Sequence, residues 1–217
     1  MSKNRNSMGA AIISRLFNEE PCCIRVAFTD VVILRPHTTN RPLQYLLNFA
    51  APKMKPLDVP DTHHLSAAQG WLELGNAGEA LRELDRITSE CQEHPDVLET
   101  RWAIEAKQLN WEECVRLATL LTHRAPGRSS GWIHRSFALH ELKRSQEAFE
   151  LLLPALTLFQ DIWVIPYNLA CYQCQLNNLK SAMEYYKQAL IMGGEPIRDM
   201  ALEDADLKSL RAKIADA

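Results

Sequence analysis

The chain has 217 residues, of which 47% are hydrophobic and 24% are charged, a composition that excludes global disorder and allows a substantial core. Its net charge of −3 is unevenly distributed. Residues 1–60 hold eight basic and four acidic residues (+4), which leaves 24 − 8 = 16 basic and 27 − 4 = 23 acidic residues (−7) for the remainder. An acidic body disfavours nucleic-acid binding, because that affinity depends on clustered Lys and Arg.

The first 60 residues are expected to form an N-terminal extension that is largely irregular, disordered or poorly packed. Prolines recur at positions 36, 42, 52, 56 and 60 and leave little room for a long helix. The β-branched run 24–34 has the composition of a strand but no evident partner strand. Two alternatives stay open: a regulatory arm that folds back into the groove of the body, and a folded protein that begins at Met54.

Targeting signals and a disulfide framework are not evident in this sequence. No apolar run reaches the roughly 18 residues of a membrane span, and Arg15 interrupts the apolar run 8–13 before a signal-peptide core forms. The six cysteines are dispersed through a chain that is long enough to bury its own core, which is typical of a reducing compartment. We therefore expect a cytoplasmic protein without membrane insertion.

From residue 61 onward the chain repeats with a constant period of 34 residues. The clearest column holds small side chains, at Ala80, Cys114, Ala148 and Ala182. Each is followed four and seven residues later by another apolar or small residue. Because small side chains let helix backbones approach closely, these four residues are predicted to form the structural core of the repeat.

A second amphipathic stretch precedes each of these small residues. These stretches are 67–74, 101–108, 135–142 and 169–176, and apolar residues recur in them at helical spacing. Short polar breaks that contain Gly, Asn, Lys or Ser separate the two halves, at 75–78, 110, 143–145 and 177–178. The pattern predicts four helix–turn–helix units, over 61–94, 95–128, 129–162 and 163–196.

The last segment, residues 197–217, is predicted to be a capping helix. Leu207, Leu210 and Ile214 lie at helical spacing in it, with charged residues beside them. The end of a repeat array requires a polar outer cover, and this segment supplies one.

These units resemble the tetratricopeptide repeat family. The resemblance covers residues 61–196 and is clearest in LELGNAGEALREL (72–84) and YNLACYQCQLNNLKSAMEYYKQAL (167–190). It implies an all-α fold, a right-handed α-solenoid of four 34-residue repeats with a C-terminal capping helix. Five residues depart from the family pattern: Arg101 and Arg135 stand where a core Leu is usual, Cys114 replaces the usual Ala, and Gln160 and Gly194 replace the closing Pro.

In that family the first helices of successive units line a concave groove that holds a partner peptide or helix. By resemblance, the partner-binding positions are Gln69, Leu72, Ala103, Lys107, Ile133, Phe137, His140, Tyr167, Asn168 and Cys171. Family members that clamp the C-terminal carboxylate of chaperones use several Lys, Arg and Asn residues there. Only Lys107 and Asn168 qualify here, so no carboxylate clamp is predicted, and a hydrophobic or basic partner segment suits the acidic body better.

Cys171 and Cys174 form a CxxC pair on the first helix of the fourth unit. Residues three apart share a helix face, so a metal or redox site is one interpretation. A structural metal site usually takes two such pairs, and the sequence has no second CxxC. We favour the other interpretation, in which both thiols are packing residues.

No nucleophile motif, P-loop, dinucleotide fingerprint or HExxH pattern occurs, so no enzymatic activity, cofactor or metal is predicted. The leading hypothesis is a non-enzymatic scaffold or adaptor that binds a partner protein in the groove of its repeats. A secretion-type chaperone for one specific partner is a narrower version of it. A metal or redox module that uses Cys171 and Cys174, and an RNA-binding array, are alternatives of other classes.

Overall fold

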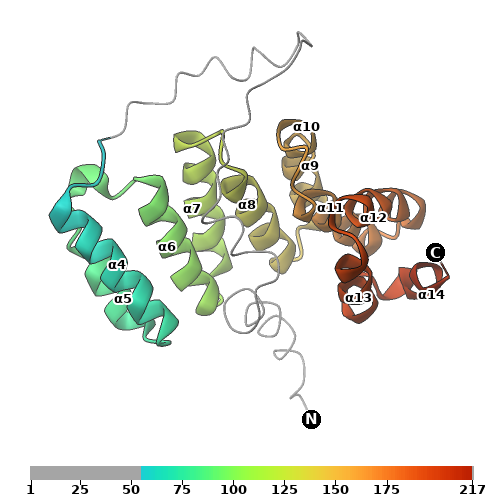
Figure 1. The fold of residues 1–217 in the computed structure, drawn as a ribbon, viewed down its shortest axis with the longest axis horizontal. Helices are drawn as coiled ribbons and strands as arrows, with labels where there is room; N and C mark the ends of the chain where they lie inside the picture. Colours follow the sequence, from blue (N-terminus) through green and yellow to red (C-terminus); the bar gives the residue numbers. More distant parts are fainter. Residues whose placement is uncertain (1–54, 217) are drawn as a thin grey trace, which may run out of the picture.

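The computed structural model describes residues 55–216, and the expectations for residues 1–54 lie outside this part of the chain. The described part consists of helices and connecting turns without a β-strand. The helices form successive hairpins that are stacked along the long axis of the molecule (Figure 1). Every helix within residues 55–216 is too short or too polar to span a lipid bilayer.

Each hairpin of the described part has a first and a second helix. The pairs are α4 (Val59–Glu73) with α5 (Ala77–Asp85), α6 (Pro95–Lys107) with α7 (Trp111–Arg124), α8 (Ser129–Glu141) with α9 (Ser145–Leu152) and α10 (Ala155–Leu158), and α11 (Val164–Gln175) with α12 (Leu179–Gly193). A 3₁₀ turn, η1 (Ser89–Cys91), connects the first pair to the second. The predicted all-α repeat architecture is therefore confirmed.

The turn inside each hairpin contains one residue in the left-handed region, and this residue recurs every 34 positions. The residues are Gly75 (φ 77°), Leu109 (φ 62°), Lys143 (φ 65°) and Asn177 (φ 63°). Gly and Asn adopt this conformation readily, whereas Leu and Lys adopt it at a cost in backbone strain. The second helix begins two residues later, at Ala77, Trp111, Ser145 and Leu179, so the turn sets the register of each helix pair.

The column of small residues lies between the helices of each hairpin. Its members, Ala80, Cys114, Ala148 and Ala182, are all 0% exposed. The residues four positions later are equally buried, namely Leu84, Ala118, Leu152 and Tyr186. Burial raises the pKa of the Cys114 thiol to about 12, so this cysteine is a neutral packing residue at physiological pH.

The second helix of the third hairpin is broken. The repeat pattern predicts one continuous helix here, but α9 ends at Leu152 and α10 begins at Ala155. Pro154 lies between them, and a proline inside a helix has no amide hydrogen to donate and crowds the carbonyl group four residues earlier. The neighbouring Leu153 is 39% exposed at this break.

Arg101 and Arg135 take a position that the buried Leu169 takes in the fourth hairpin. The guanidinium of Arg101 donates to Asp85 on α5 at 3.0 Å. The guanidinium of Arg135 lies 5.4 Å from the ring centroid of Trp132. Both arginines are partly buried, and the guanidinium of Arg135 also donates to the carbonyl oxygen of Leu151 at 3.4 Å.

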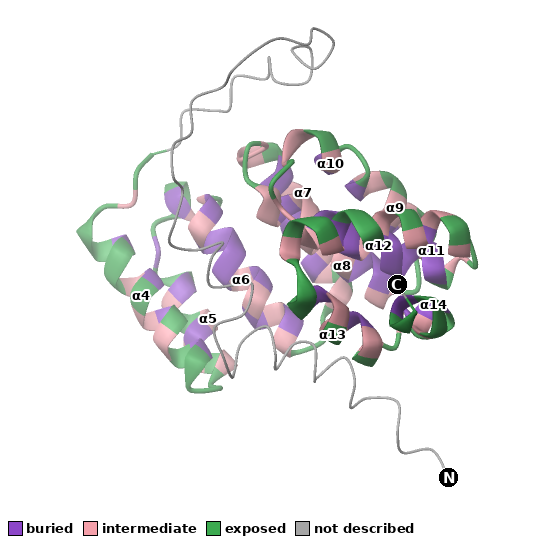
Figure 2. Ribbon diagram, turned by 45° about the vertical axis from the view of Figure 1, so that its right-hand side comes forward, coloured by how far each residue is buried: buried purple, intermediate pink, exposed green. Residues whose placement is uncertain are grey.

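The buried residues form three clusters along the array. In Figure 2 the buried stretches of the ribbon lie on the sides of the helices that face neighbouring helices. The first cluster joins α4 and α5 to α6, the second joins α6 and α7 to α8, and the third extends from α8 to the C-terminal helices. The first two clusters are each completed by the next hairpin, as expected for a repeat array, and the third is completed by the C-terminal helices.

The C-terminal cap consists of two helices where the sequence predicts one over 197–217. Helix α13 (Glu195–Glu203) is followed by a turn, the 3₁₀ segment η2 (Lys208–Leu210) and helix α14 (Arg211–Ala215) (Figure 1). Leu207, Leu210 and Ile214 are each 0% exposed, so the cap is anchored by apolar packing.

Candidate partner-binding surface

The first helices of the hairpins, α4, α6, α8 and α11, carry all the residues that the sequence predicts to bind a partner. We call the side of these helices that holds those residues the inner face. The structure divides the predicted residues into two groups. Most of those on α4, α6 and the middle of α8 are exposed or partly exposed, whereas His140 at the end of α8 and most of those on α11 are covered.

Two contacts join α4 to α6 along the inner face. The exposed Gln69 places its side-chain amide nitrogen 3.4 Å from the hydroxyl of Thr100. The ammonium group of Lys107 donates to the carbonyl oxygen of Leu72 at 2.7 Å. Burial lowers the pKa of Lys107, while the charge of Glu73 opposes that shift. Lys107 is thus tied to the last turn of α4, and the side chain of Leu72 is buried in the first cluster.

Ala103, Ile133 and Phe137 are partly exposed and supply the apolar part of the inner face. The ring of Phe137 meets Trp111 edge-on, with ring centroids 5.7 Å apart, and it meets Trp102 at 6.5 Å. Phe137 therefore fills the gap between the second and third hairpins in addition to bordering solvent.

The inner face of the fourth hairpin is covered by a C-terminal strap, which we define as residues 204–207 between α13 and η2. The hydroxyl of Tyr167 donates to Asp204 Oδ2 at 2.7 Å, and the thiol of Cys171 lies 3.8 Å from the same oxygen. Tyr167 and Cys171 are each 5% exposed, whereas Asn168 is partly exposed. The chain's own C-terminus therefore occupies much of this part of the surface.

The strap also reaches the end of α8. Asp206 Oδ2 lies 3.1 Å from His140 Nε2, and Ser145 Oγ lies 2.9 Å from Nδ1 of the same ring. The order Ser–His–Asp is that of a nucleophile, a base and an orienting group. However, the imidazole is 4% exposed and packs on Tyr172 with ring centroids 4.9 Å apart. We therefore assign these hydrogen bonds to holding the strap against α8 and α9.

Burial dominates the acid–base chemistry under the strap. It raises the pKa of the Asp204 carboxyl, although Tyr167 and the backbone N–H of Asp206 donate hydrogen bonds to that group. It also raises the pKa of the Cys171 thiol well above its ordinary value and that of Cys174 above its own. Neutral thiols are poor nucleophiles and poor metal ligands. The described part of the chain contains no group of three or more His, Cys, Asp or Glu that could hold a metal ion.

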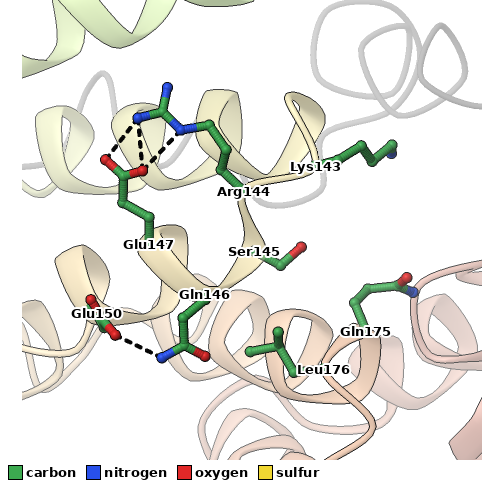
Figure 3. A pocket seen from close by; sticks show the side chains of 8 residues that line it. All are labelled: Lys143, Arg144, Ser145, Gln146, Glu147, Glu150, Gln175 and Leu176. Carbon is green, nitrogen blue, oxygen red and sulfur yellow. Dashed lines mark hydrogen bonds and ion pairs between the residues drawn. The ribbon is translucent and has the colours of Figure 1, made fainter.

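An open depression of ≈ 700 Å³ adjoins the turn between α8 and α9 (Figure 3). All of its lining side chains except that of Leu176 are polar, and four of them form two pairs. Arg144 donates to Glu147 at 2.8 Å, and Gln146 donates to Glu150 at 2.7 Å. Small-molecule sites are usually lined by apolar and aromatic side chains, so we assign no such ligand to this depression.

The sequence does not predict the contacts of the strap, because Asp204 and Asp206 have the pattern of charged residues in a polar cover. The signal in the sequence is that Asp206 directly precedes Leu207, one of the regularly spaced apolar residues of the cap. Carboxylates in such surroundings require hydrogen-bond donors, but the sequence does not identify which donors supply them.

No family model matches the chain, and no curated protein matches its sequence. Among solved structures, the chain resembles MamA (41-end) from Desulfovibrio magneticus RS-1, with a TM-score of 0.59 and 16% identity over 74% of this chain and 94% of that chain. It also resembles a MamA RS-1 ArsTM double mutant, with the same TM-score and identity over 74% of this chain and 93% of that chain. Similarity at this level of identity concerns the fold alone, and it supports a tetratricopeptide-like helical repeat.

Proposed function

We propose that this chain is a non-enzymatic scaffold that binds a segment of a partner protein along the inner faces of α4, α6 and α8. The observation that carries the proposal is the unequal cover of the inner face. The strap covers Tyr167 and Cys171 of the fourth hairpin, whereas Gln69, Ala103 and Ile133 of the first three are exposed or partly exposed. A segment that lies along these three hairpins meets side chains from all of them.

The chemistry of the surface favours a partner segment that combines apolar and basic side chains. Ala103, Ile133 and Phe137 offer apolar contacts, and the small Ala103 leaves room for a side chain of the partner. Residues 55–216 hold 17 basic and 24 acidic residues, a net charge of −7, which attracts Lys and Arg. Lys107 is held by the carbonyl group of Leu72, which argues against a role in clamping a carboxylate.

Affinity capture with the full chain, followed by binding measurements on each purified candidate, tests the proposal. Ala103→Arg places a long charged side chain where the small Ala103 leaves room for the partner. Ile133→Asp places a charge on the apolar part of α8. We expect each substitution to weaken the affinity about tenfold or more, as is typical for central interface residues. The matched control is Gln188→Arg, an exposed position on α12 away from the inner face, which should leave the affinity unchanged.

Circular dichroism of each variant separates a lost interaction from a lost fold. A partner that binds the Ala103 and Ile133 variants as tightly as the unsubstituted chain contradicts the assignment of the inner face. If Gln188→Arg alone weakens binding, the interaction surface lies on the second helices instead.

A further inference from the structure

Helix α4 is apolar on the side that faces away from the rest of the molecule. Val59, His63, Ala67, Gly70 and Leu74 are spaced four, four, three and four residues apart, so they form one stripe along the helix and its C-cap. We call these five residues the outward stripe. Within residues 55–216, seven large hydrophobic residues are exposed, and three of them belong to this helix or its C-cap: Val59 at 69%, Leu74 at 77%, and Trp71, beside the stripe, at 37%.

The opposite side of α4 already supplies the first core cluster through Leu65, Ala68 and Leu72. The helix is thus apolar on two opposite sides, although only one of them is covered in the described part of the chain. A helix that is apolar on both sides is normally buried between two neighbours.

In the later hairpins, the positions equivalent to His63 and Gly70 contact the preceding hairpin, whereas the equivalents of Val59 (Glu93, Gly127 and Asp161) are exposed. The equivalents of His63 are Val97, Gly131 and Ile165, and the equivalents of Gly70 are Ile104, Ala138 and Tyr172; all six are buried. Val97 and Ile104, for example, belong to the same cluster as Ala80 and Leu84 of the first hairpin. By contrast, a Cβ atom added at Gly70 meets no atom within 4 Å apart from its chain neighbours and the backbone of α4 itself.

The sequence upstream of α4 contains a segment whose apolar residues follow the spacing of the second helices. Residues 43–52, LQYLLNFAAP, lie outside the described part and stand 34 positions before the start of α5. In this register Leu47 aligns with the apolar column of Leu81, Val115, Phe149 and Met183, and Ala50 aligns with the buried column of Leu84, Ala118, Leu152 and Tyr186. Leu46 aligns with the fully buried column of Ala80, Cys114, Ala148 and Ala182, and its side chain is larger than any of these. Asn48 aligns with Arg82, Arg116, Glu150 and Glu184, which are all exposed.

The path of the chain into α4 agrees with this register. Lys55 forms an ion pair with Glu90 at 3.3 Å, and Leu57 packs against the first cluster. The chain therefore enters α4 at the edge of the array where the second helices end and the next first helices begin. Residues 55–58 lead into α4 as residues 125–128 lead into α8.

We propose that residues 43–52 pack on the outward stripe of α4 as the second half of a preceding repeat unit. The segment that covers the stripe belongs to this chain, because its apolar residues match the 34-residue register. Lys55 and Leu57 also place the chain at the edge of the array where the second helices end. This inference does not depend on the proposed function, since it concerns the end of the array and not its inner face.

Hydrogen exchange of the full chain, measured by mass spectrometry, tests this packing. The probe is the exchange rate of the amides of α4 in the unsubstituted chain, in Leu46→Asp and in Asn48→Asp. We expect Leu46→Asp to accelerate exchange in α4 about tenfold or more and to leave α13 and α14 unchanged. Asn48→Asp places the same charge at an exposed column of the register and should leave α4 unchanged.

Equal exchange of α4 in all three proteins overturns the proposal. Protection of α4 that decreases on dilution also overturns it, because a second copy then covers the stripe. If Leu46→Asp does not fold, Leu46→Ala and Asn48→Ala provide the same comparison without an added charge. Leu74→Asp tests the contact from the other side and should reproduce the effect of Leu46→Asp.

Discussion

The hydroxyl of Tyr167 donates a 2.7 Å hydrogen bond to Asp204, which joins the first turn of α11 to the turn that follows α13. Burial raises the pKa of this carboxyl, so its hydrogen-bond donors offset part of the cost of burying it. The neighbouring Leu207 and Leu210 are fully buried and anchor the strap. The polar contacts then fix where the strap crosses the inner face.

Replacement of an anchor of the strap should expose the thiols beneath it. Leu210→Ala removes a fully buried side chain, which typically costs about 2–5 kcal/mol and here loosens the strap. We expect Cys171 and Cys174 to react faster with N-ethylmaleimide, as measured by peptide-resolved mass spectrometry. Cys91 and Cys114 are buried elsewhere and serve as internal controls. Equal acceleration at all four cysteines indicates global unfolding and contradicts a local role of the strap.

Gly131 allows α8 to approach α7 closely. A Cβ atom at this position lies 3.0 Å from the backbone nitrogen of Thr122 and 3.2 Å from the side chain of Leu121. Gly131→Ala should therefore lower the free energy of unfolding by about 1–3 kcal/mol through overpacking, measured by urea denaturation. Gly78→Ala makes the same chemical change in α5, where the nearest atom is 3.7 Å away. This control should be neutral or stabilising by up to about 1 kcal/mol, and equal losses in both variants would exclude close packing as the cause.

Ala148 tests the column of small residues. It is 0% exposed, so Ala148→Leu has to separate the helices of the third hairpin. We expect a loss of about 1–3 kcal/mol in the free energy of unfolding. Gln146→Leu, an exposed position on the same helix, should change it by less than about 0.5 kcal/mol. If Ala148→Leu leaves the free energy of unfolding unchanged, the helices at this column are not packed closely enough to exclude a larger side chain.

His134 should make the stability of the protein depend on pH. Its ring stacks on Trp102 with centroids 3.9 Å apart, and burial lowers its pKa from 6.5 to about 4. Between these two values the unfolded chain binds more protons than the folded chain, so the free energy of unfolding decreases as the pH falls from about 6.5 to about 4. The contribution of this group is at most about 3 kcal/mol.

Denaturant titrations across this pH range check the contribution of His134. His134→Phe keeps a ring on Trp102 and should flatten the pH dependence relative to the unsubstituted chain. His123→Phe, an exposed position on α7, should retain it. If both variants keep the full pH dependence, other groups account for it.

The hairpins could be predicted because their signals are local and periodic. The 34-residue spacing of Ala80, Cys114, Ala148 and Ala182 predicts where the second helices lie, and those helices begin at the same spacing. The polar breaks at Asn177 and Lys143 likewise contain the residues with positive φ. Turn chemistry and helix periodicity depend only on neighbouring residues, so one sequence suffices for them.

The strap could not be predicted, because its contacts join residues that are distant in the chain. Asp204 meets Tyr167, and Asp206 meets His140, which lies 66 positions away. A pattern of apolar residues does not indicate which hydrogen-bond donor a buried carboxylate will pair with. The break of α9 at Pro154 had a local signal, but the continuous apolar pattern across it favours an unbroken helix. The predicted set of groove residues stays a prediction that binding measurements have to test.

The three separate core clusters determine how cooperatively the protein unfolds. Because each hairpin depends chiefly on its neighbours, one end of such an array can unfold while the remainder stays intact. The third cluster joins the last two hairpins to the cap, whereas the first joins only α4 and α5 to α6. Thermal denaturation should therefore proceed from the N-terminal hairpin toward the C-terminus, and probes at the two ends should report different midpoints instead of one melting temperature.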